Sequence, residues 1–266
     1  MYIIGAAVAN EQAKVALYDK EYKLLNKKEG KAEDLSKLCL ELAPEMKDVE
    51  YIGVAAKDFG AVAAELEKDT GVKCFGESVI SARALGEAYI TNDVPFVAML
   101  KIDDSVECGI VMDKKVFSGA NQEGVNAARM IIKFDGYECK CGAKGCFEAY
   151  ASVSGLKRIA SEAGVSDADA LTHEKLFAMN TPEAEKAKTL YVEYLASGIT
   201  DIINLFQPNE LVLEGPFTEV GDALWNPLMA IILHDQYTHS MPNKCNVRFS
   251  NKEIDTALLG AALLGR

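Results

Sequence analysis

The sequence has little positive charge. Its 266 residues include 28 Lys and Arg against 40 Asp and Glu, which gives a formal net charge of −12 at pH 7. A surface that binds nucleic acid must collect phosphates and release their counterions, and this needs an excess of basic side chains. The charge balance therefore argues against a nucleic-acid partner, and we expect none.

Long hydrophobic runs are also missing. The opening segment, residues 1–9, is apolar but too short to cross a bilayer, has no basic leader and is followed by polar residues. We interpret it as a buried first strand, and we expect a cytoplasmic protein that does not contact a membrane. The 7 prolines and 20 glycines are thinly spread, so we expect no linker or low-complexity segment between ordered domains.

Cysteine is sparse outside one short stretch. Four of the seven cysteines stand singly in apolar or strand-like surroundings, which predicts small buried side chains rather than halves of disulfides, as in a reducing compartment. These four are Cys39, Cys74, Cys108 and Cys245.

The other three cysteines are clustered. Cys139, Cys141 and Cys146 follow one another closely, and Gly142 and Gly145 between them allow the backbone to bend sharply. Thiolates that converge at this spacing are typical of a structural zinc knuckle. The alternatives are an empty, reduced knuckle and a disulfide between two of the three thiols.

The order of elements predicts an α/β fold with an internal repeat. Apolar alternation predicts three consecutive strands near residues 2–8, 13–19 and 22–28, followed by alternating helices and strands. After Pro95 three strands recur in succession, and helices and short strands follow again. This recurrence indicates two similar units. The alternative is a generic three-layer α/β protein.

The knuckle carries a resemblance to a known family. The run Cys139-x-Cys141-Gly142-x-x-Gly145-Cys146-x-Glu148, followed by Tyr150-Ala151-Ser152, resembles the signature of the ROK family (repressors, open reading frames and sugar kinases). Weaker similarity extends over the whole chain. The resemblance implies the actin-like, ribonuclease-H-like duplicated two-domain α/β fold with an interdomain cleft. We expect residues 1–94 plus 252–266 to form a smaller domain, and residues 95–251 to form a larger one that contains the knuckle.

Kinases of this family phosphorylate hexoses with ATP and magnesium, and the resemblance assigns their catalytic positions to this sequence. The catalytic aspartate falls at Val79, which cannot accept a proton. The glycine-rich phosphate hairpins fall at residues 7–12 and 103–109, where glycines are replaced and acidic side chains stand instead. We therefore expect no catalytic residue among these positions and no binding of ATP or magnesium.

The family's sugar-binding and zinc-binding positions are partly replaced. Glu148 matches a sugar-binding residue, and Asn126 is a partial substitute for another. Arg129 falls at the family histidine that is the fourth zinc ligand, and an arginine cannot ligate a metal. Zinc would then need water, a carboxylate or a histidine as its fourth ligand. The histidines of the chain are His173, His234 and His239.

Together these replacements predict a sugar-kinase-like protein without kinase activity, a pseudokinase that acts as a binding or regulatory protein for a sugar-like small molecule. The alternative is a divergent ATP-dependent hexose kinase in which Glu77, Asp103 or Asp104 takes a new role. A ROK repressor is not expected, because we see no DNA-binding segment before the first strand and the charge is strongly negative. The resemblance also implies a homo-oligomer, with a dimer expected.

Overall fold

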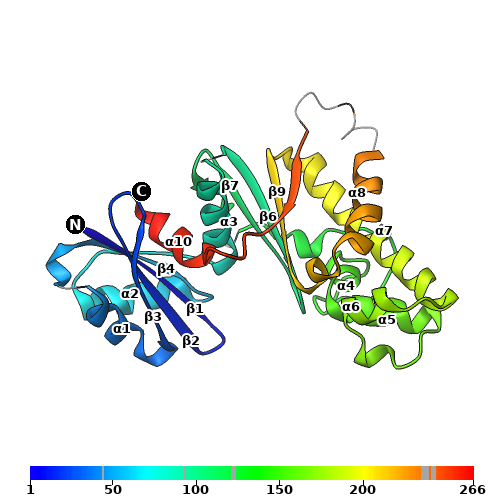
Figure 1. The fold of residues 1–266 in the computed structure, drawn as a ribbon, viewed down its shortest axis with the longest axis horizontal. Helices are drawn as coiled ribbons and strands as arrows, with labels where there is room; N and C mark the ends of the chain where they lie inside the picture. The colour runs from blue at the N-terminus through cyan, green and yellow to red at the C-terminus, as the bar shows by residue number, and fades with distance from the viewer. Residues whose placement is uncertain (44, 93, 121–123, 235–239, 241–243) are drawn as a thin grey trace. The chain divides into compact units, whose positions relative to one another are not determined.

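The computed structural model describes residues 1–43, 45–92, 94–120, 124–234, 240 and 244–266. Contacts between Cα atoms divide the chain into two units (Figure 1). Unit 1 comprises Met1–Met99, Gly109–Gly124 and Asn251–Arg266, and unit 2 comprises Leu100–Cys108 and Val125–Ser250. None of the described helices is both long enough and apolar enough to span a bilayer. The domain boundaries expected from the sequence remain a prediction.

The first sheet begins with the three consecutive strands that the sequence predicts. Its strand order is β3-β2-β1-β4-β5. β1 is antiparallel to β2 and parallel to β4, and β4 is parallel to β5. The strands are β1 (Tyr2–Ala9), β2 (Gln12–Tyr18), β3 (Leu24–Lys31), β4 (Val49–Ala55) and β5 (Cys74–Glu77).

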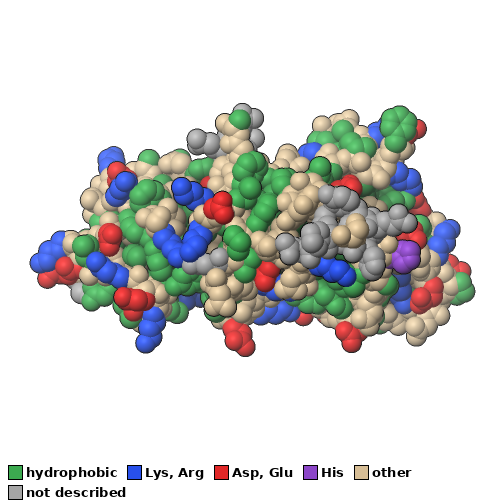
Figure 2. Space-filling model, turned by 90° about the horizontal axis from the view of Figure 1, so that it is seen from above, with side chains coloured by type: hydrophobic (Ala, Val, Ile, Leu, Met, Phe, Trp, Pro, Cys, Tyr) green, Lys and Arg blue, Asp and Glu red, His purple; other side chains and the backbone are tan. Residues whose placement is uncertain are grey.

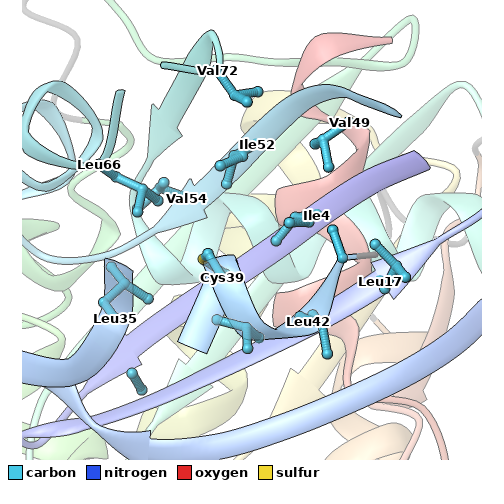
Figure 3. Packing of buried hydrophobic residues seen from close by; sticks show 14 of the residues in the cluster. Ile4, Leu17, Leu35, Cys39, Leu42, Val49, Ile52, Val54, Leu66 and Val72 are labelled. Atoms are coloured by element: carbon cyan, nitrogen blue, oxygen red, sulfur yellow. The ribbon is translucent and has the colours of Figure 1, made fainter. Parts of the chain in front are cut away.

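Side chains alternate between the two faces of this sheet, as the two-residue period of a strand requires. On one face Ile4, Ile52 and Leu66 pack with Cys39 in a fully apolar core (Figure 3). The helices that contribute to this core are α1 (Leu35–Leu42) and α2 (Phe59–Thr70). Cys39 is therefore the small buried side chain that the sequence predicts.

The other face is covered by α10 (Thr256–Ala262), which α3 (Val79–Ile90) crosses very closely. Glycines make this approach possible. A Cβ on Gly260 would overlap the carbonyl oxygen of Ala82, and a Cβ on Gly86 would overlap that of Thr256. The backbones of α3 and α10 are thus in direct contact, with no side chain between them at these positions.

The second sheet repeats the arrangement of the first. Its strand order is β10-β9-β6-β7-β8, so three strands that are consecutive in the chain lie on one side and two later strands on the other. This confirms the predicted internal repeat. The strands are β6 (Phe96–Ile102), β7 (Val106–Met112), β8 (Lys115–Val116), β9 (Glu210–Glu214) and β10 (Asn246–Phe249).

The helices of unit 2 lie between β7 and β10 in the sequence. Most begin at a residue whose side chain caps them: Ser152 accepts from the Gly155 N–H at the start of α5, and Thr181 accepts from the Ala184 N–H at the start of α7. The helices are α4 (Glu148–Ala151), α5 (Val153–Ala163), α6 (His173–Ala178), α7 (Pro182–Phe206) and α8 (Asp222–His234).

The charged side chains do not gather by sign on the face shown in Figure 2. Basic and acidic side chains are interspersed there among the described residues. A face of this kind lacks the continuous basic surface that phosphate backbones require.

Candidate functional site

The three clustered cysteines lie on a compact turn between the short 3-10 helix Ala127–Arg129 and α4. The Cys139 N–H donates to the Ala143 carbonyl at 2.9 Å, and the Gly142 N–H donates to the Cys139 carbonyl at the same distance. Gly142 and Gly145 have φ angles of 88° and 80°, in the left-handed region that favours glycine. The two glycines thus allow the bends that the sequence predicts, and the thiols converge.

The three sulfur atoms lie within 4.8 Å of one another. Cys141 Sγ and Cys146 Sγ are 3.6 Å apart, and all three thiols are free. Tetrahedral zinc with Zn–S bonds of about 2.3 Å would separate its sulfurs by about 3.8 Å. The donor set therefore fits a zinc ion after small adjustments.

Burial and hydrogen bonding act differently on two of these thiols. A backbone hydrogen bond from Ala143, with those from the neighbouring thiols, lowers the pKa of Cys141, which is exposed. Burial, followed by the neighbouring thiols, raises the pKa of Cys146 to about 12. Without a cation at the cluster, Cys141 is thus the more acidic of this pair.

No further His, Asp or Glu of the described part of the chain joins the cysteine cluster. His173 is fully buried, and its Nε2 lies 2.8 Å from the Tyr191 hydroxyl, which in turn donates to the Ala151 carbonyl. His234 ends α8 and lines a separate groove with Asp201 and Ile231. Neither histidine lies at the cysteine cluster: His173 is held in the core beside Tyr191, and His234 is exposed at the end of α8. His239 lies outside the described residues.

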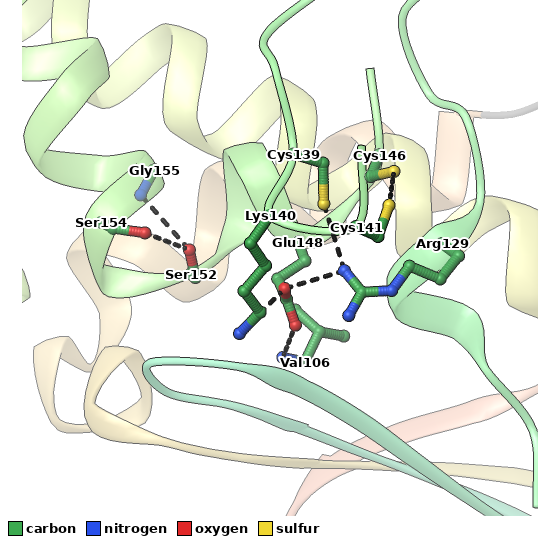
Figure 4. Close-up of polar contacts among 10 residues, drawn as sticks. All are labelled: Val106, Arg129, Cys139, Lys140, Cys141, Cys146, Glu148, Ser152, Ser154 and Gly155. Atoms are coloured by element: carbon green, nitrogen blue, oxygen red, sulfur yellow. Dashed lines mark hydrogen bonds and ion pairs between the residues drawn. The ribbon is translucent and has the colours of Figure 1, made fainter. Parts of the chain in front are cut away.

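Arg129 links the cysteine cluster to Glu148 (Figure 4). Its Nη1 donates to Cys139 Sγ at 3.1 Å and to Glu148 Oε1 at 2.9 Å. Lys140 Nζ lies 3.1 Å from the same carboxylate oxygen, and the Val106 N–H donates to the other oxygen at 3.1 Å. The guanidinium therefore occupies the space between a thiol and a buried carboxylate.

The Glu148 carboxylate is held in its charged form inside unit 2. The residue is only 5% exposed. Burial alone would raise the pKa of this carboxyl, but the Val106 N–H, Lys140 and Arg129 outweigh it and lower the pKa. Oε1 accepts from Arg129 and Lys140 and Oε2 from Val106, so three of the about four acceptor positions of the carboxylate are in use.

Asn126, the second predicted sugar-binding residue, lies at the start of the turn that ends in Arg129. Its carbonyl accepts from the Arg129 N–H at 3.1 Å, and its side chain is exposed. Asn126 thereby helps to form the turn that carries Arg129. Its participation in sugar binding stays a prediction.

A cavity of about 210 Å³ lies beside Glu148. Its lining carries both signs of charge, since it includes Asp104 and Glu138 as well as Lys140 and Arg158. Asp104 belongs to the β6–β7 hairpin, which closes through a 2.9 Å bond from the Asp103 N–H to the Ser105 carbonyl. This tight turn carries the acidic side chains of Asp103 and Asp104.

Val79 occupies an apolar position in unit 1. It is the first residue of α3, whose N-terminus is capped by Ser78, and it packs against Ala55, Ala82 and Ala261. Glu77, the nearest carboxylate before it in the chain, accepts from the Ser78 N–H at 2.8 Å and from Ser118 Oγ at 3.2 Å.

The β1–β2 hairpin of unit 1 is a two-residue turn without glycine. Asn10 and Glu11 both have positive φ angles, 49° and 63°, between the paired residues Ala9 and Gln12. The Glu11 carbonyl accepts from the Ala32 N–H at 2.9 Å. The turn is thus tied to the following segment and places a carboxylate at its tip.

Sequence reasoning did not identify two of the residues at the Glu148 site. The sequence shows Arg129 only as the replacement of a zinc-binding histidine, and its contact with Cys139, ten positions later, forms only on folding. Lys140 lies inside the cysteine motif, where its pairing with Glu148 gives no sequence signal.

Two sheets with the same strand order, each starting with three consecutive strands, define the actin-like class of α/β proteins, and the cysteine knuckle follows the second set of three. The chain belongs to the ROK family, whose sequence model matches residues 46–266. The class and family inferred from the knuckle motif are therefore confirmed.

Relatives of known name include kinases and repressors. A glucokinase of Thermotoga maritima is 25% identical over 217 residues, which cover 74% of this chain and 67% of that protein. A xylose repressor of Bacillus spizizenii is 26% identical over 165 residues, which cover 61% of this chain and 40% of the repressor. The match thus spans well under half of that repressor.

The fold also matches solved structures of the family. A ROK hexokinase from Thermus thermophilus superposes with a TM-score of 0.85 at 22% identity, over 99% of this chain and 97% of that one. At this identity the likeness shows the shared fold.

Proposed function

We propose that this chain is a ROK-family, sugar-kinase-like protein that has lost phosphotransfer and acts as a binding or regulatory protein. The observation that carries the proposal is the environment of Val79, which packs among three alanine side chains where the family's kinases have an aspartate. A valine cannot take the proton of a sugar hydroxyl, and loss of a general base costs about a hundredfold to ten-thousandfold in rate.

The Glu148 network supports the same proposal. A kinase that binds a hexose through this carboxylate needs its oxygens as acceptors, whereas here Arg129, Lys140 and the Val106 N–H use them. A sugar-like ligand at Glu148 and Asn126 would find one acceptor position left on this carboxylate, at Oε2, or would have to displace one of these partners. Such a ligand is therefore expected to bind weakly.

The alternative function is a divergent ATP-dependent hexose kinase. The similarity to proteins named glucokinase favours it. Glu77 is the carboxylate nearest to Val79 in the chain, but it already accepts two hydrogen bonds. Under this alternative Glu77 would have to leave Ser118 to act as a base.

We further propose that Cys139, Cys141 and Cys146 hold a structural zinc ion. The converging sulfurs support this, since thiolates packed so closely are stabilised by a cation. Homo-oligomerisation, with a dimer expected, and a cytoplasmic location are proposed from the ROK resemblance and from the composition. Nucleic acid is not proposed as a partner.

The experiment adds ATP with magnesium, and a panel of hexoses, to the purified protein and follows both the melting temperature and ADP formation. A ligand at a hundred times its dissociation constant would stabilise the fold by about 2.7 kcal/mol, which is easily detected. We expect no shift with ATP and no sugar-dependent ADP. A clear ATP shift or hexose-dependent turnover would refute the pseudokinase proposal.

The variant Val79→Asp sharpens this test. Because the phosphate hairpins are also replaced, a restored aspartate alone should give no turnover above the wild type. A glucokinase relative serves as the positive control of the assay. Turnover by Val79→Asp would mean that ATP still binds and that only the base is missing.

A further inference from the structure

Arg129 contacts a thiol that belongs to the proposed zinc site. Its Nη1 lies 3.1 Å from Cys139 Sγ, and its side chain is 32% exposed, so the guanidinium is partly shielded from water. A guanidinium has five N–H donors in a fixed planar fork and never loses its charge under ordinary conditions. It can donate to a thiolate and to a carboxylate at once, and this is the arrangement observed with Glu148.

The charges around the cluster make this contact significant. Three thiolates on a divalent cation leave one net negative charge. Arg129 and Lys140 both pair with Glu148, at 2.9 Å and 3.1 Å, so these two cations and one carboxylate leave one net positive charge. The positive charge of Arg129 is then the one that compensates the metal–thiolate group through a direct hydrogen bond.

The described residues supply no fourth protein ligand. The cluster contains three sulfurs and no further His, Asp or Glu of that part of the chain. Cys139 and Cys146 are buried, whereas Cys141 is exposed, so water can reach the cluster from the side of Cys141. A solvent molecule can therefore complete the tetrahedron.

We propose that Arg129 is an outer-sphere positioning residue of a three-thiolate zinc site, which holds the Cys139 thiolate by a charge-assisted hydrogen bond while solvent takes the fourth coordination position. This inference rests on the proposed zinc binding by Cys139, Cys141 and Cys146. Arg129 thus supplies a compensating positive charge instead of a ligand atom, and the solvent molecule at the fourth coordination position can exchange.

The test measures zinc affinity by competition with a chromophoric chelator on the full chain under reducing conditions. Arg129→Met should weaken zinc binding about 10-fold to 100-fold, the usual effect of removing an outer-sphere partner. Lys140→Met is the matched control: it removes the same charge from the same network, but its ion pair is with Glu148 rather than with a sulfur. We expect the control to lose less than about threefold, since its side chain is exposed.

X-ray absorption at the zinc edge of the wild type gives a second readout that does not depend on any variant. We expect three sulfurs at about 2.3 Å and one oxygen at about 2.0 Å. An imidazole or a fourth sulfur in the first shell would overturn the proposed coordination. If Arg129→Met does not fold, Arg129→Lys takes its place, with a smaller loss of affinity expected because it keeps the charge but not the fork.

The two proposals fail in different ways. A wild type that binds no zinc, or that forms a Cys141–Cys146 disulfide instead, refutes the zinc site itself. Zinc bound with equal affinity by Arg129→Met and Lys140→Met refutes the role of Arg129 alone.

Discussion

Arg129 and Glu148 form an ion pair 2.9 Å apart in which the carboxylate is almost completely buried and the guanidinium is about one-third exposed. Arg129→Ala should lower the free energy of unfolding by about 2 kcal/mol, because it leaves a buried charge with fewer partners. Urea unfolding of the metal-free, reduced protein measures this without any contribution from zinc.

The matched control for this prediction is Lys31→Ala. Its pair with Glu33 is exposed at both ends, 71% and 73%, so its loss should cost less than about 0.5 kcal/mol. Equal effects of the two variants would mean that the Arg129–Glu148 pair contributes no more than a surface pair.

The knuckle offers a comparison between two glycines. A Cβ on Gly145 would overlap the Lys133 carbonyl oxygen, whereas a Cβ on Gly142 would meet no atom within 4 Å, although both have positive φ. Gly142→Ala should cost about 1 kcal/mol from backbone strain alone. Gly145→Ala should cost at least about twice as much and reduce the zinc content of the purified protein. Equal stability in unfolding curves and equal zinc content for the two variants would contradict this prediction.

Burial lowers the pKa of His173 from its ordinary value of 6.5 to about 4. At a pH between these two values, the unfolded chain binds a proton at His173 that the folded chain does not. The contribution of His173 to the free energy of unfolding is therefore complete at neutral pH and is lost as the pH falls from 6.5 to about 4. The contribution of this residue amounts to about 3 kcal/mol over that window. Urea unfolding at pH 8 and at pH 4.5 tests this: between these two pH values the free energy of unfolding should fall less for His173→Gln than for the wild type. An equal fall in the free energy of unfolding for the variant and the wild type would show that His173 does not cause the pH dependence.

The crossing of α3 and α10 gives a fourth prediction. Gly260→Ala would force a methyl group against the Ala82 carbonyl and should destabilise unit 1 by at least about 3 kcal/mol. Gly60→Ala, within α2 and with no atom within 4 Å of the added methyl, should be neutral or stabilising by up to about 1 kcal/mol. Denaturant midpoints test this, and a tolerated Gly260→Ala would mean that the two helices can separate.

Much of the fold was predictable because its signals are local. Apolar alternation places the three opening strands to within a few residues of those observed, and the cysteine motif gives the family. The 3-10 turn at Ala127–Arg129 and the four-residue α4 were not predicted, because neither is long enough to show a period. The 3-10 turn Ala168–Ala170, which precedes α6, is likewise too short to show a period.

The chemistry of the site was less predictable, because it depends on residues that meet only after folding. The residue type alone makes His173 a candidate zinc ligand, but its imidazole is hydrogen-bonded to Tyr191, eighteen positions later. Val106 contributes a backbone N–H to Glu148 from 42 positions away, and such a donor leaves no trace in the side-chain pattern. Burial and partner choice of this kind are tertiary properties.

The interleaving of the two units has a consequence for how the protein is made. Unit 1 needs α10 to cover one face of its sheet, yet α10 follows all of unit 2 in the chain. During translation the face of the N-terminal sheet that contains Gly5 and Gly53 therefore stays without α10 until unit 2 has emerged from the ribosome. Unit 2, whose residues are nearly continuous in sequence, can finish its core first, so the half of the molecule that is synthesised first is completed last.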